Sequence, residues 1–235
     1  MLDSYSAALI VGAPIVRNKH KKHCQRLALN LDFDEDFRPF NPSLAMHNDT
    51  AFGVIRVDNF RPYLDQTYYF DAQTKGAKNI FCKFNADLKV IESDWLTLQS
   101  IPDDLESSWL SFEDLRLFSW QKGLWAIGAL HIQKDHNGKL DLSKKICRQA
   151  LVRLEDGKMT LCTVFPSPLK LKEEKNWAPL VIGENLYFAY SVDPLVLFQF
   201  NEGRLLLVSK KPNAHENIRL RGGSQFVHWK DGTMR

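Results

Sequence analysis

The stretch Ser111-Phe112-Glu113-Asp114-Leu115-Arg116-Leu117-Phe118 places two acids and an arginine at the start of an apolar segment. Trp120-Gln121-Lys122-Gly123 then has the composition of a tight turn, and residues 124–130 that of a returning strand. The pattern predicts a hairpin whose first strand begins with charged side chains.

Alternation along that strand predicts how its charged side chains are arranged. Successive side chains of an extended chain point to opposite faces, so Asp114 and Arg116 would share one face, and Glu113 and Leu115 the other, more apolar one. A carboxylate beside a guanidinium is costly to bury unless both are paired. The simplest explanation is a structural ion pair, since such pairs also perturb pKa values. A functional explanation gains weight because the same layout recurs along the chain.

Length and composition indicate an ordinary globular protein. The chain has 235 residues, of which 44% are hydrophobic and 25% charged, so it can bury a full core as one large all-β domain or two smaller ones. The formal net charge of +3 is too small to argue for a nucleic-acid partner. The basic run at residues 17–23 is expected to be a solvated loop.

The cysteines and the hydropathy favour a cytoplasmic protein. Cys24, Cys82, Cys147 and Cys162 stand far apart without metal-binding or redox spacing, as expected for free thiols in a reducing compartment. No apolar run approaches the roughly 20 residues of a membrane span, and residues 9–16 lack the basic residue that precedes the core of a signal peptide. We therefore expect no membrane partner, no metal and no organic cofactor.

Four similar units follow residues 1–38, which hold two apolar segments. Each unit has a polar cluster, an inner strand, a tight turn and an apolar second strand, and the first three continue with further short strands. They cover approximately residues 39–100, 107–165, 174–212 and 218–235, the last unit being partial. Few segments show a helical period.

Repeats of roughly 40 to 50 residues with four strands each are typical of a β-propeller. The inner strands of a propeller converge on a central channel, so the polar clusters at their starts would meet at one end of it. The sequence therefore predicts an all-β propeller with about three to four blades present. Residues 1–38 are expected to pack on the blades or to close them.

Four polar motifs have this layout: Asn41-Pro42-Ser43 with Arg56 downstream, Glu113-Asp114-Leu115-Arg116, Lys175-Asn176-Trp177, and Arg221-Gly222-Gly223. The set resembles the five-bladed β-propeller superfamily of glycoside hydrolases and phosphorylases, over about residues 40–230. The nearest branch is that of the β-mannoside phosphorylases and the related mannosyltransferase-like proteins. The second motif of that branch is usually Glu-Asp-Pro-Arg, and here Leu115 replaces the proline.

The resemblance implies roles for single residues. Asp114 falls where the family keeps its proton donor. The residues expected to bind sugar or phosphate are Asn41, Arg56, Glu113, Arg116, Lys175, Asn176, Tyr190, Arg221 and His228. Structural roles stay open beside these: an acid on a neighbouring strand as the partner of Arg56, a solvated position for Lys175, and packing in the core for Trp177 and Tyr190.

The balance of charges suggests a reaction. Glycoside cleavage usually uses two carboxylates, whereas the motifs offer one well-placed acid, Asp114, with Glu113 and Asp193 as competitors, and several cations. An excess of cations suits a reaction in which inorganic phosphate or a sugar nucleotide supplies the negative charge. The expected activity is therefore phosphorolysis of β-mannosides or similar glycosides, or glycosyl transfer.

Two other functions remain open. A non-catalytic or degenerate sugar-binding propeller is favoured by Leu115 and by the short fourth unit, in which His228 is the last candidate ligand. Plain glycoside hydrolysis would need no anion. The partial fourth unit also suggests a missing C-terminal segment or a homo-oligomer that closes the ring, because an incomplete ring would expose a strand edge.

Overall fold

The structure, a computed structural model, describes residues 6–11, 25–31, 38–58, 61–62, 68–69, 77–100, 105, 108–136, 139–140, 146–212 and 226. The regular elements within these ranges are β-strands. No helix among these residues is long and apolar enough to cross a membrane. The basic run at residues 17–23, Cys24 and the proposed fourth-unit residues Arg221 and His228 lie outside the described residues.

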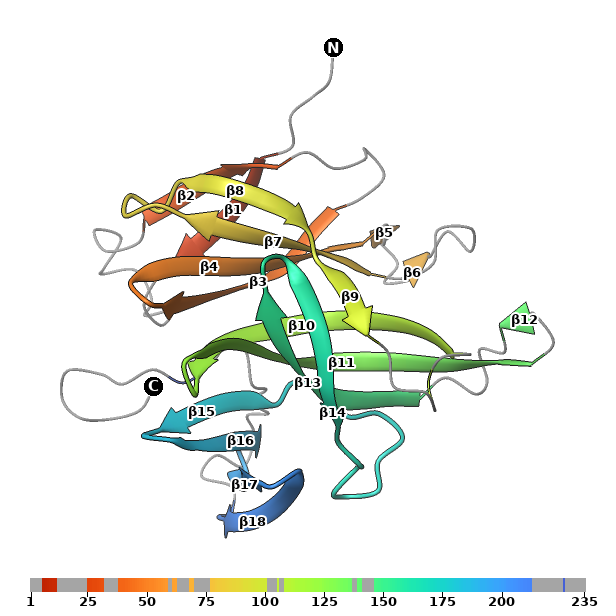
Figure 1. Cartoon of the computed structure of the whole chain (residues 1–235). Coiled ribbons are helices and arrows are strands. Elements are labelled where there is room, and N and C mark those ends of the chain that lie inside the picture. The colour runs from red at the N-terminus through yellow and green to blue at the C-terminus, as the bar shows by residue number, and fades with distance from the viewer. Residues whose placement is uncertain are drawn as a thin grey trace.

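Three antiparallel sheets form the body of the structure and follow one another from top to bottom in Figure 1. The first contains β3 (Arg38–His47), β4 (Thr50–Asp58), β7 (Lys78–Phe84) and β8 (Val90–Trp95). The second contains β10 (Ser108–Trp120), β11 (Gly123–His136), β13 (Ile146–Glu155) and β14 (Lys158–Val164). The third contains β15 (Ala178–Ile182), β16 (Asn185–Ser191), β17 (Val196–Asn201) and β18 (Arg204–Lys210).

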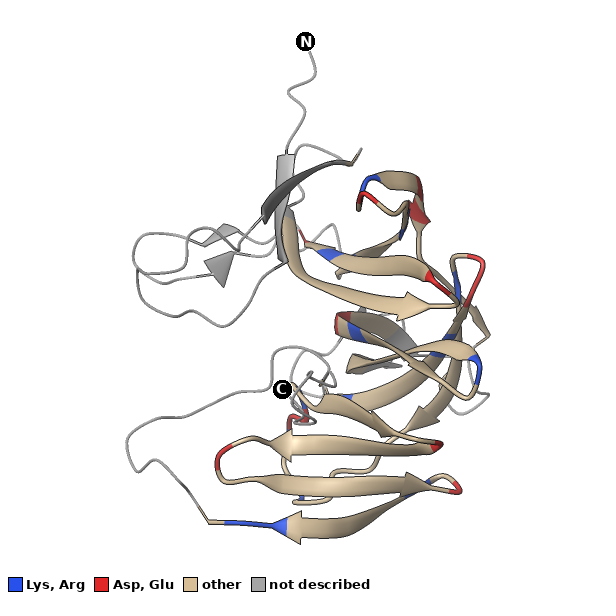
Figure 2. Cartoon of the chain, turned by 90° about the vertical axis from the view of Figure 1, so that its left-hand side faces the viewer, with Lys and Arg blue, Asp and Glu red and all other residues tan. Residues whose placement is uncertain are grey.

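The four strands named for each sheet follow chain order, and tight turns join pairs such as β3–β4, β10–β11 and β15–β16. The hairpin expected around residues 111–130 is confirmed as β10 and β11, which turn at Gln121 and Lys122. Figure 2 shows the acidic residues of the third sheet at its turns, whereas the middles of its strands are uncharged. Polar turns and apolar strands are thus separated as the sequence pattern predicts.

Shorter strands are attached to these sheets. β1 (Ser6–Val11) pairs with β2 (Gln25–Asn30), β5 (Arg61–Pro62) pairs with β6 (Tyr68–Tyr69), and β12 (Lys139–Leu140) pairs with β11. β9 (Thr97–Ser100) follows β8 in the chain, but it pairs in parallel with β14. The chain therefore crosses from the last strand of the first sheet to the last strand of the second.

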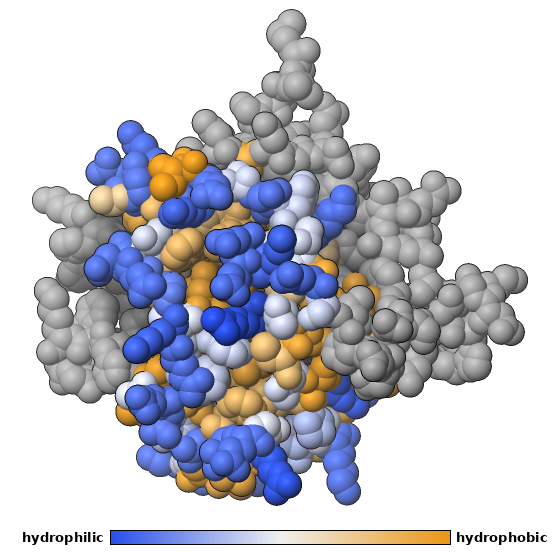
Figure 3. Space-filling view, in the orientation of Figure 1, coloured by the Kyte–Doolittle hydropathy of each residue, from blue (hydrophilic) through white to orange (hydrophobic). Residues whose placement is uncertain are grey.

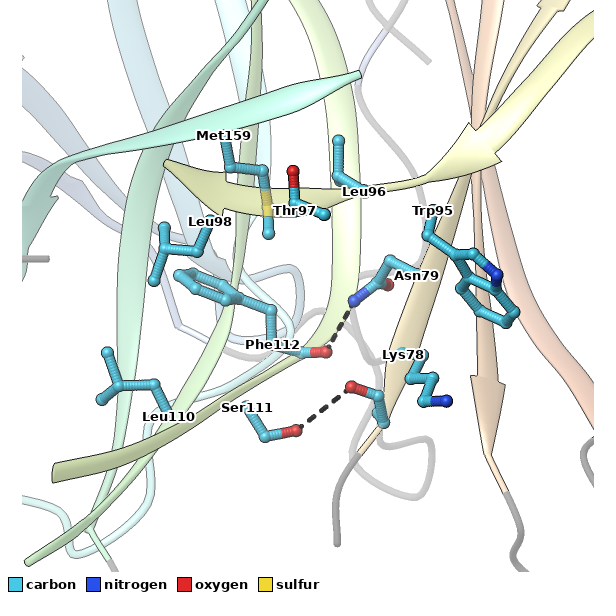
Figure 4. A pocket seen from close by; sticks show the side chains of 11 residues that line it. Lys78, Asn79, Trp95, Leu96, Thr97, Leu98, Leu110, Ser111, Phe112 and Met159 are labelled. Atoms are coloured by element: carbon cyan, nitrogen blue, oxygen red, sulfur yellow. Dashed lines mark hydrogen bonds between the residues drawn. The ribbon is translucent and has the colours of Figure 1, made fainter. Parts of the chain in front are cut away.

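β9 covers a cavity of about 350 Å³ between the first two sheets, seen from close by in Figure 4. Leu98, Phe112 and Met159 contribute apolar walls. Nδ2 of Asn79, on β7, donates a hydrogen bond of 3.0 Å to the backbone oxygen of Phe112, on β10. This bond ties the first sheet to the second beside the crossing strand.

The hydrophobic core lies mainly between the sheets. Ala45 and Val54 of the first sheet pack in one cluster with the apolar side chains of β10, β11, β13 and β14. Phe165, Trp177 and Phe188 form a second cluster between the second and third sheets. Burying a large apolar side chain completely contributes about 1.5–3 kcal/mol relative to leaving it exposed, so these clusters fix how the sheets stack.

The first strands of the three sheets lie next to one another. β10 contacts both β3 and β15. The backbone N–H of Leu117 on β10 donates a hydrogen bond of 2.8 Å to Oγ of Ser43 on β3. The inner strands expected from the sequence are therefore neighbours in space, although they are far apart in the chain.

Left-handed backbone recurs near the start of each first strand. The register of β3 with β4 shifts between Phe40 and Ser43, and that of β10 with β11 shifts between Glu113 and Arg116. The residues with positive φ at these places are Asn41 (42°), Asp114 (54°) and, before β15, Asn176 (67°). Asn and Asp tolerate this conformation better than other non-glycine residues.

The last strand of the third sheet exposes apolar side chains. Leu206, Leu207 and Val208 on β18 are exposed at 47%, 57% and 46%, and Figure 3 shows hydrophobic residues at the surface in the lower part of the molecule. Among the described strands, β18 pairs only with β17. A strand edge of this kind is a place where another strand can add.

Gly128 on β11 makes room for the bulge of β10, which gives the first testable prediction. A Cβ at this position would lie 2.8 Å from Cδ2 of Leu115 and 3.0 Å from the backbone oxygen of Glu113. The backbone oxygen of Glu113 cannot move away without distorting the strand. Gly128→Ala is therefore expected to lower the free energy of unfolding by about 1–3 kcal/mol in urea denaturation.

Gly53→Ala is the matched control for this substitution. Its Cβ would meet ring and methyl atoms of Phe84 and Leu44, which can shift, so a smaller loss is expected. An equal or larger loss for Gly53→Ala would contradict the role given to Gly128.

Candidate functional site

A polar cavity lies between β3, the bulge of β10 and the segment before β15, and we call it the axial cavity. Its volume is about 310 Å³. All three sheets, or the segments directly before them, contribute to its wall. The lining residues are Asn41, Pro42, Ser43, Asp114, Leu115, Arg116 and Asn176. The polar clusters of the first three units thus converge as the sequence predicts.

Asp114 is held at this cavity by two donors from the first sheet. Its Oδ1 accepts hydrogen bonds from Nδ2 of Asn41 at 2.7 Å and from Nη1 of Arg56 at 3.1 Å. The side chain is 24% exposed. The carboxylate belongs to the second sheet, but the first sheet fixes its orientation.

Arg56 on β4 joins three acids. Its Nη2 lies 2.7 Å from Oδ2 of Asp58, and its Nη1 lies 3.1 Å from Oδ1 of Asp114 and 3.3 Å from Oε2 of Glu113. Burial by itself would lower the pKa of this guanidinium, but Glu113, Asp58 and Asp114 together hold the pKa above its usual value. Arg56 is therefore a permanent positive charge shared by these acids.

Glu113 and Asp114 both reach the same guanidinium, which corrects the expectation from strand alternation. A regular strand would have turned them to opposite faces. The bulge between Glu113 and Arg116 interrupts the pleat, and the left-handed φ of Asp114 redirects its side chain. Leu115 takes the buried position, with 1% exposure.

Arg116 connects the second sheet to the segment that leads into the third. Its Nη2 donates a hydrogen bond of 3.1 Å to Oδ1 of Asn176. Burial lowers the pKa of Arg116, and the nearby Asp114 opposes this shift. The side chain is 6% exposed and lines the axial cavity, so the cavity wall contains a largely desolvated cation.

His131 on β11 contacts Glu113 from within the second sheet. Its Nε2 lies 3.2 Å from Oε2 of Glu113 and 4.0 Å from Sγ of Cys147. In a nucleophilic triad the histidine uses one nitrogen for the nucleophile and the other for the acid, whereas here both neighbours meet Nε2. Burial raises the pKa of Cys147 to about 11, which keeps the thiol protonated. Cys147 is therefore a structural residue.

Glu174 is a buried carboxylate that the sequence pattern does not single out, because it lies in the charged run at residues 172–175. It is 1% exposed. Trp177 Nε1 donates to it at 3.3 Å, Tyr190 OH donates to it at 3.4 Å, and Ser167 Oγ also donates to it. Burial and Glu174 raise the pKa of Tyr190. Trp177 therefore packs in the core, Tyr190 packs against it half-buried, and Glu174 anchors the segment that carries Asn176.

Only some of the cations expected at the site lie there. Lys175 does not line the axial cavity, since its ammonium pairs with Glu173 at 3.2 Å and both side chains are at least half exposed. Asp193 lies in the turn between β16 and β17 and is not a lining residue. Within the described ranges, the network around Asp114 contains two arginines and three acids, so the predicted excess of positive charge is not found there.

Two members of the site were missed in the sequence. Asp58 follows Arg56 by two residues on one strand, a spacing that puts both side chains on one face and could have indicated the pair. His131 lies in an apolar strand, and no nearby residue in the sequence indicates a functional role for it. Only the register of β10 with β11, which sets His131 opposite Ser111, brings it beside Glu113.

No metal site is apparent in the part of the chain that the structure describes, because no three His, Cys, Asp or Glu side chains there are grouped suitably. Cys82, Cys147 and Cys162 are free thiols, as predicted. Burial also raises the pKa of Cys82, to about 12.

Comparison with solved structures identifies proteins of similar fold. A glycosyl hydrolase from Bacteroides ovatus superposes with a TM-score of 0.50 at 10% sequence identity, over 82% of this chain and 58% of that chain. The hemagglutinin-neuraminidase ectodomain of parainfluenza virus 5 gives a TM-score of 0.45 at 9% identity, over 81% and 45% of the two chains. No protein-family model and no curated protein matches the sequence.

The likeness to the glycosyl hydrolase concerns the fold, and this chain spans a little over half of that protein's length. The predicted all-β propeller fold is confirmed. The number of blades and the β-mannoside phosphorylase branch remain predictions.

Removing Arg56 is expected to destabilise the protein strongly. Asp58 is 2% exposed, so Arg56→Met would leave a buried carboxylate without its cation and lower the free energy of unfolding by about 3–5 kcal/mol. The double variant Arg56→Met/Asp58→Asn should recover part of this loss, because it removes the unpaired charge.

Lys175→Met is the control for this experiment, since it breaks an ion pair that is exposed. It should change the unfolding free energy in urea by less than about 1 kcal/mol. Similar losses for Arg56→Met and Lys175→Met would mean that the Arg56 network does not stabilise the first two sheets.

Proposed function

We propose that the protein is a carbohydrate-active enzyme that cleaves a glycoside in the axial cavity, with Asp114 as its catalytic acid. One observation carries the proposal: the carboxylate of Asp114 lines a polar cavity built from three distant chain segments, and Asn41 and Arg56 hold it there. The fold likeness to a glycosyl hydrolase supports the class of reaction and leaves the substrate open.

The lining of the cavity suits a sugar. Side-chain amides from Asn41 and Asn176, the hydroxyl of Ser43 and the guanidinium of Arg116 offer the donors and acceptors that sugar hydroxyls need. A volume of about 310 Å³ lies at the lower end of ligand pockets, which span about 300–1,000 Å³. The cavity therefore suits the sugar unit next to the scissile bond, with the rest of the substrate outside.

The charges around Asp114 favour water over phosphate as the attacking group. Asp58, Glu113 and Asp114 outnumber Arg56 and Arg116 in the described network. Arg56 is already surrounded by carboxylates, so it offers little attraction to a further anion. Glycoside hydrolysis uses a pair of acids, and Glu113 and Asp114 meet at one guanidinium.

A second candidate is phosphorolysis of β-mannosides or glycosyl transfer to them. The observation in its favour is Arg116, a cation in the cavity wall with 6% exposure. An anionic co-substrate in the cavity would meet this guanidinium. Lys175, which pairs with Glu173, would have to approach to complete such a site.

The test incubates the whole chain with aryl β-mannosides, other aryl glycosides and manno-oligosaccharides, with and without inorganic phosphate. Free reducing sugar in both conditions would support hydrolysis. Sugar 1-phosphate formed only with phosphate would support phosphorolysis instead. Binding on a sugar array without any product would indicate a non-catalytic sugar-binding propeller.

Asp114→Asn is expected to reduce kcat by about 10²–10⁴-fold, because general acid catalysis contributes that much. Asn also tolerates the left-handed backbone at this position, so the fold should be kept. Asp49→Asn is the matched control, since Asp49 has a φ of 59° in the exposed turn between β3 and β4. An Asp114→Asn variant with undiminished kcat would refute the assignment.

A further inference from the structure

Glu113 lies between two side chains that approach it from different sheets. Its Oε2 is 3.3 Å from Nη1 of Arg56, on β4, and 3.2 Å from Nε2 of His131, on β11. The side chain of Glu113 is 24% exposed and that of His131 is 9% exposed. Glu113 is therefore the group that solvent or a ligand can reach, and His131 supports it from the interior.

The surroundings of His131 determine which ring nitrogen carries the proton. Its Nδ1 is buried, and no described residue forms a hydrogen bond with it. A buried N–H without an acceptor is rare and costly, whereas a bare ring nitrogen loses only an acceptor interaction. The proton therefore belongs on Nε2, which donates it to Oε2 of Glu113.

We propose that His131 is a positioning residue that holds Glu113 as the second acid of the site. The inference rests on the proposed glycoside cleavage, which needs two carboxylates. Arg56 Nη1 contacts both acids, at 3.1 Å for Asp114 and 3.3 Å for Glu113. The guanidinium of Arg56 thus sets the distance between the two carboxylates. Asn41 holds Asp114, and His131 holds Glu113.

The two acids then divide the chemistry. Both carboxylates lie within 3.3 Å of one guanidinium nitrogen, which is too close for a water to stand between the acids, so Glu113 bonds to the anomeric carbon as the bond to the leaving oxygen breaks with its electron pair and Asp114 gives that oxygen a proton. Water then gives a proton to Asp114, and its oxygen displaces the carboxylate of Glu113 from the anomeric carbon, which restores both acids. Glu113 does not line the axial cavity itself, but it shares Nη1 of Arg56 with Asp114, which does.

Two variants of His131 separate positioning from simple core packing. His131→Leu removes the donor and should lower kcat by about 10–100-fold, while KM changes by less than about threefold. The reason is that a displaced catalytic group slows the chemical step but leaves substrate binding nearly unchanged. His131→Gln keeps an N–H donor and should recover most of kcat. Because Glu113 keeps Arg56 as a partner and Nδ1 of His131 has none among the described residues, the apolar replacement should cost little stability.

Cys147→Ala is the control, since it removes the other neighbour of Nε2. It should leave kcat within about twofold, because a buried thiol is a weak donor. Unchanged kcat in His131→Leu, or no recovery in His131→Gln, would overturn the inference. Equal losses of kcat in Cys147→Ala and His131→Leu would also overturn it, because they would point to packing.

A spectroscopic test works without any turnover. Nitrogen-15 NMR of the imidazole ring should show His131 as the Nε2–H tautomer in the wild type, and Glu113→Gln should shift the resonance of that nitrogen. A Nδ1–H tautomer would overturn the inference by itself. If no glycoside is cleaved, the proposed function has failed, and the NMR result still decides whether His131 holds Glu113.

Discussion

The guanidinium of Arg56 lies among three carboxylates that come from two sheets. Asp58 is its neighbour on β4, whereas Glu113 and Asp114 approach from β10. Acids that close together would repel one another, but an arginine stays charged at physiological pH and compensates them. The placement of both candidate catalytic acids therefore depends on this one side chain. The same contacts join the first sheet to the second beside the axial cavity.

Backbone conformation explains why these particular residue types line the cavity. Asn41 in β3, Asp114 at the bulge of β10 and Asn176 just before β15 all have left-handed φ. Asn and Asp accept that conformation, and their short polar side chains then turn out of the pleat. The left-handed backbone favours Asn and Asp, and a polar cavity also needs short polar side chains, so both needs are met by the same residue types. The left-handed backbone is sufficient to explain why Asn occurs at positions 41 and 176. At position 114 the contacts with Asn41 and Arg56 also favour a carboxylate.

The third sheet reaches the site through the segment before β15. The buried carboxylate of Glu174 accepts from Trp177 and Tyr190 in the core of that sheet, while its backbone oxygen accepts from Cys147 and Gln149 of the second sheet. Asn176 is thereby held where Arg116 can reach it. Burying a carboxylate is acceptable because several donors satisfy it. The position of one cavity residue thus depends on contacts deep between the sheets.

The strands, the turns and the repeated order of polar cluster and apolar strand could be predicted from the sequence, because these follow from local periodicity and turn chemistry. The sequence also identified Asn41, Asp114, Arg116 and Asn176, which the structure brings to one cavity. The tertiary structure was needed to show that Glu113 joins Asp114 at Arg56, that His131 belongs to the site, and that Lys175 pairs with Glu173 instead. A bulge overrides the alternation of a strand, and the partner of a charge is set by distances between sheets. Neither can be read from the spacing of residues along the chain.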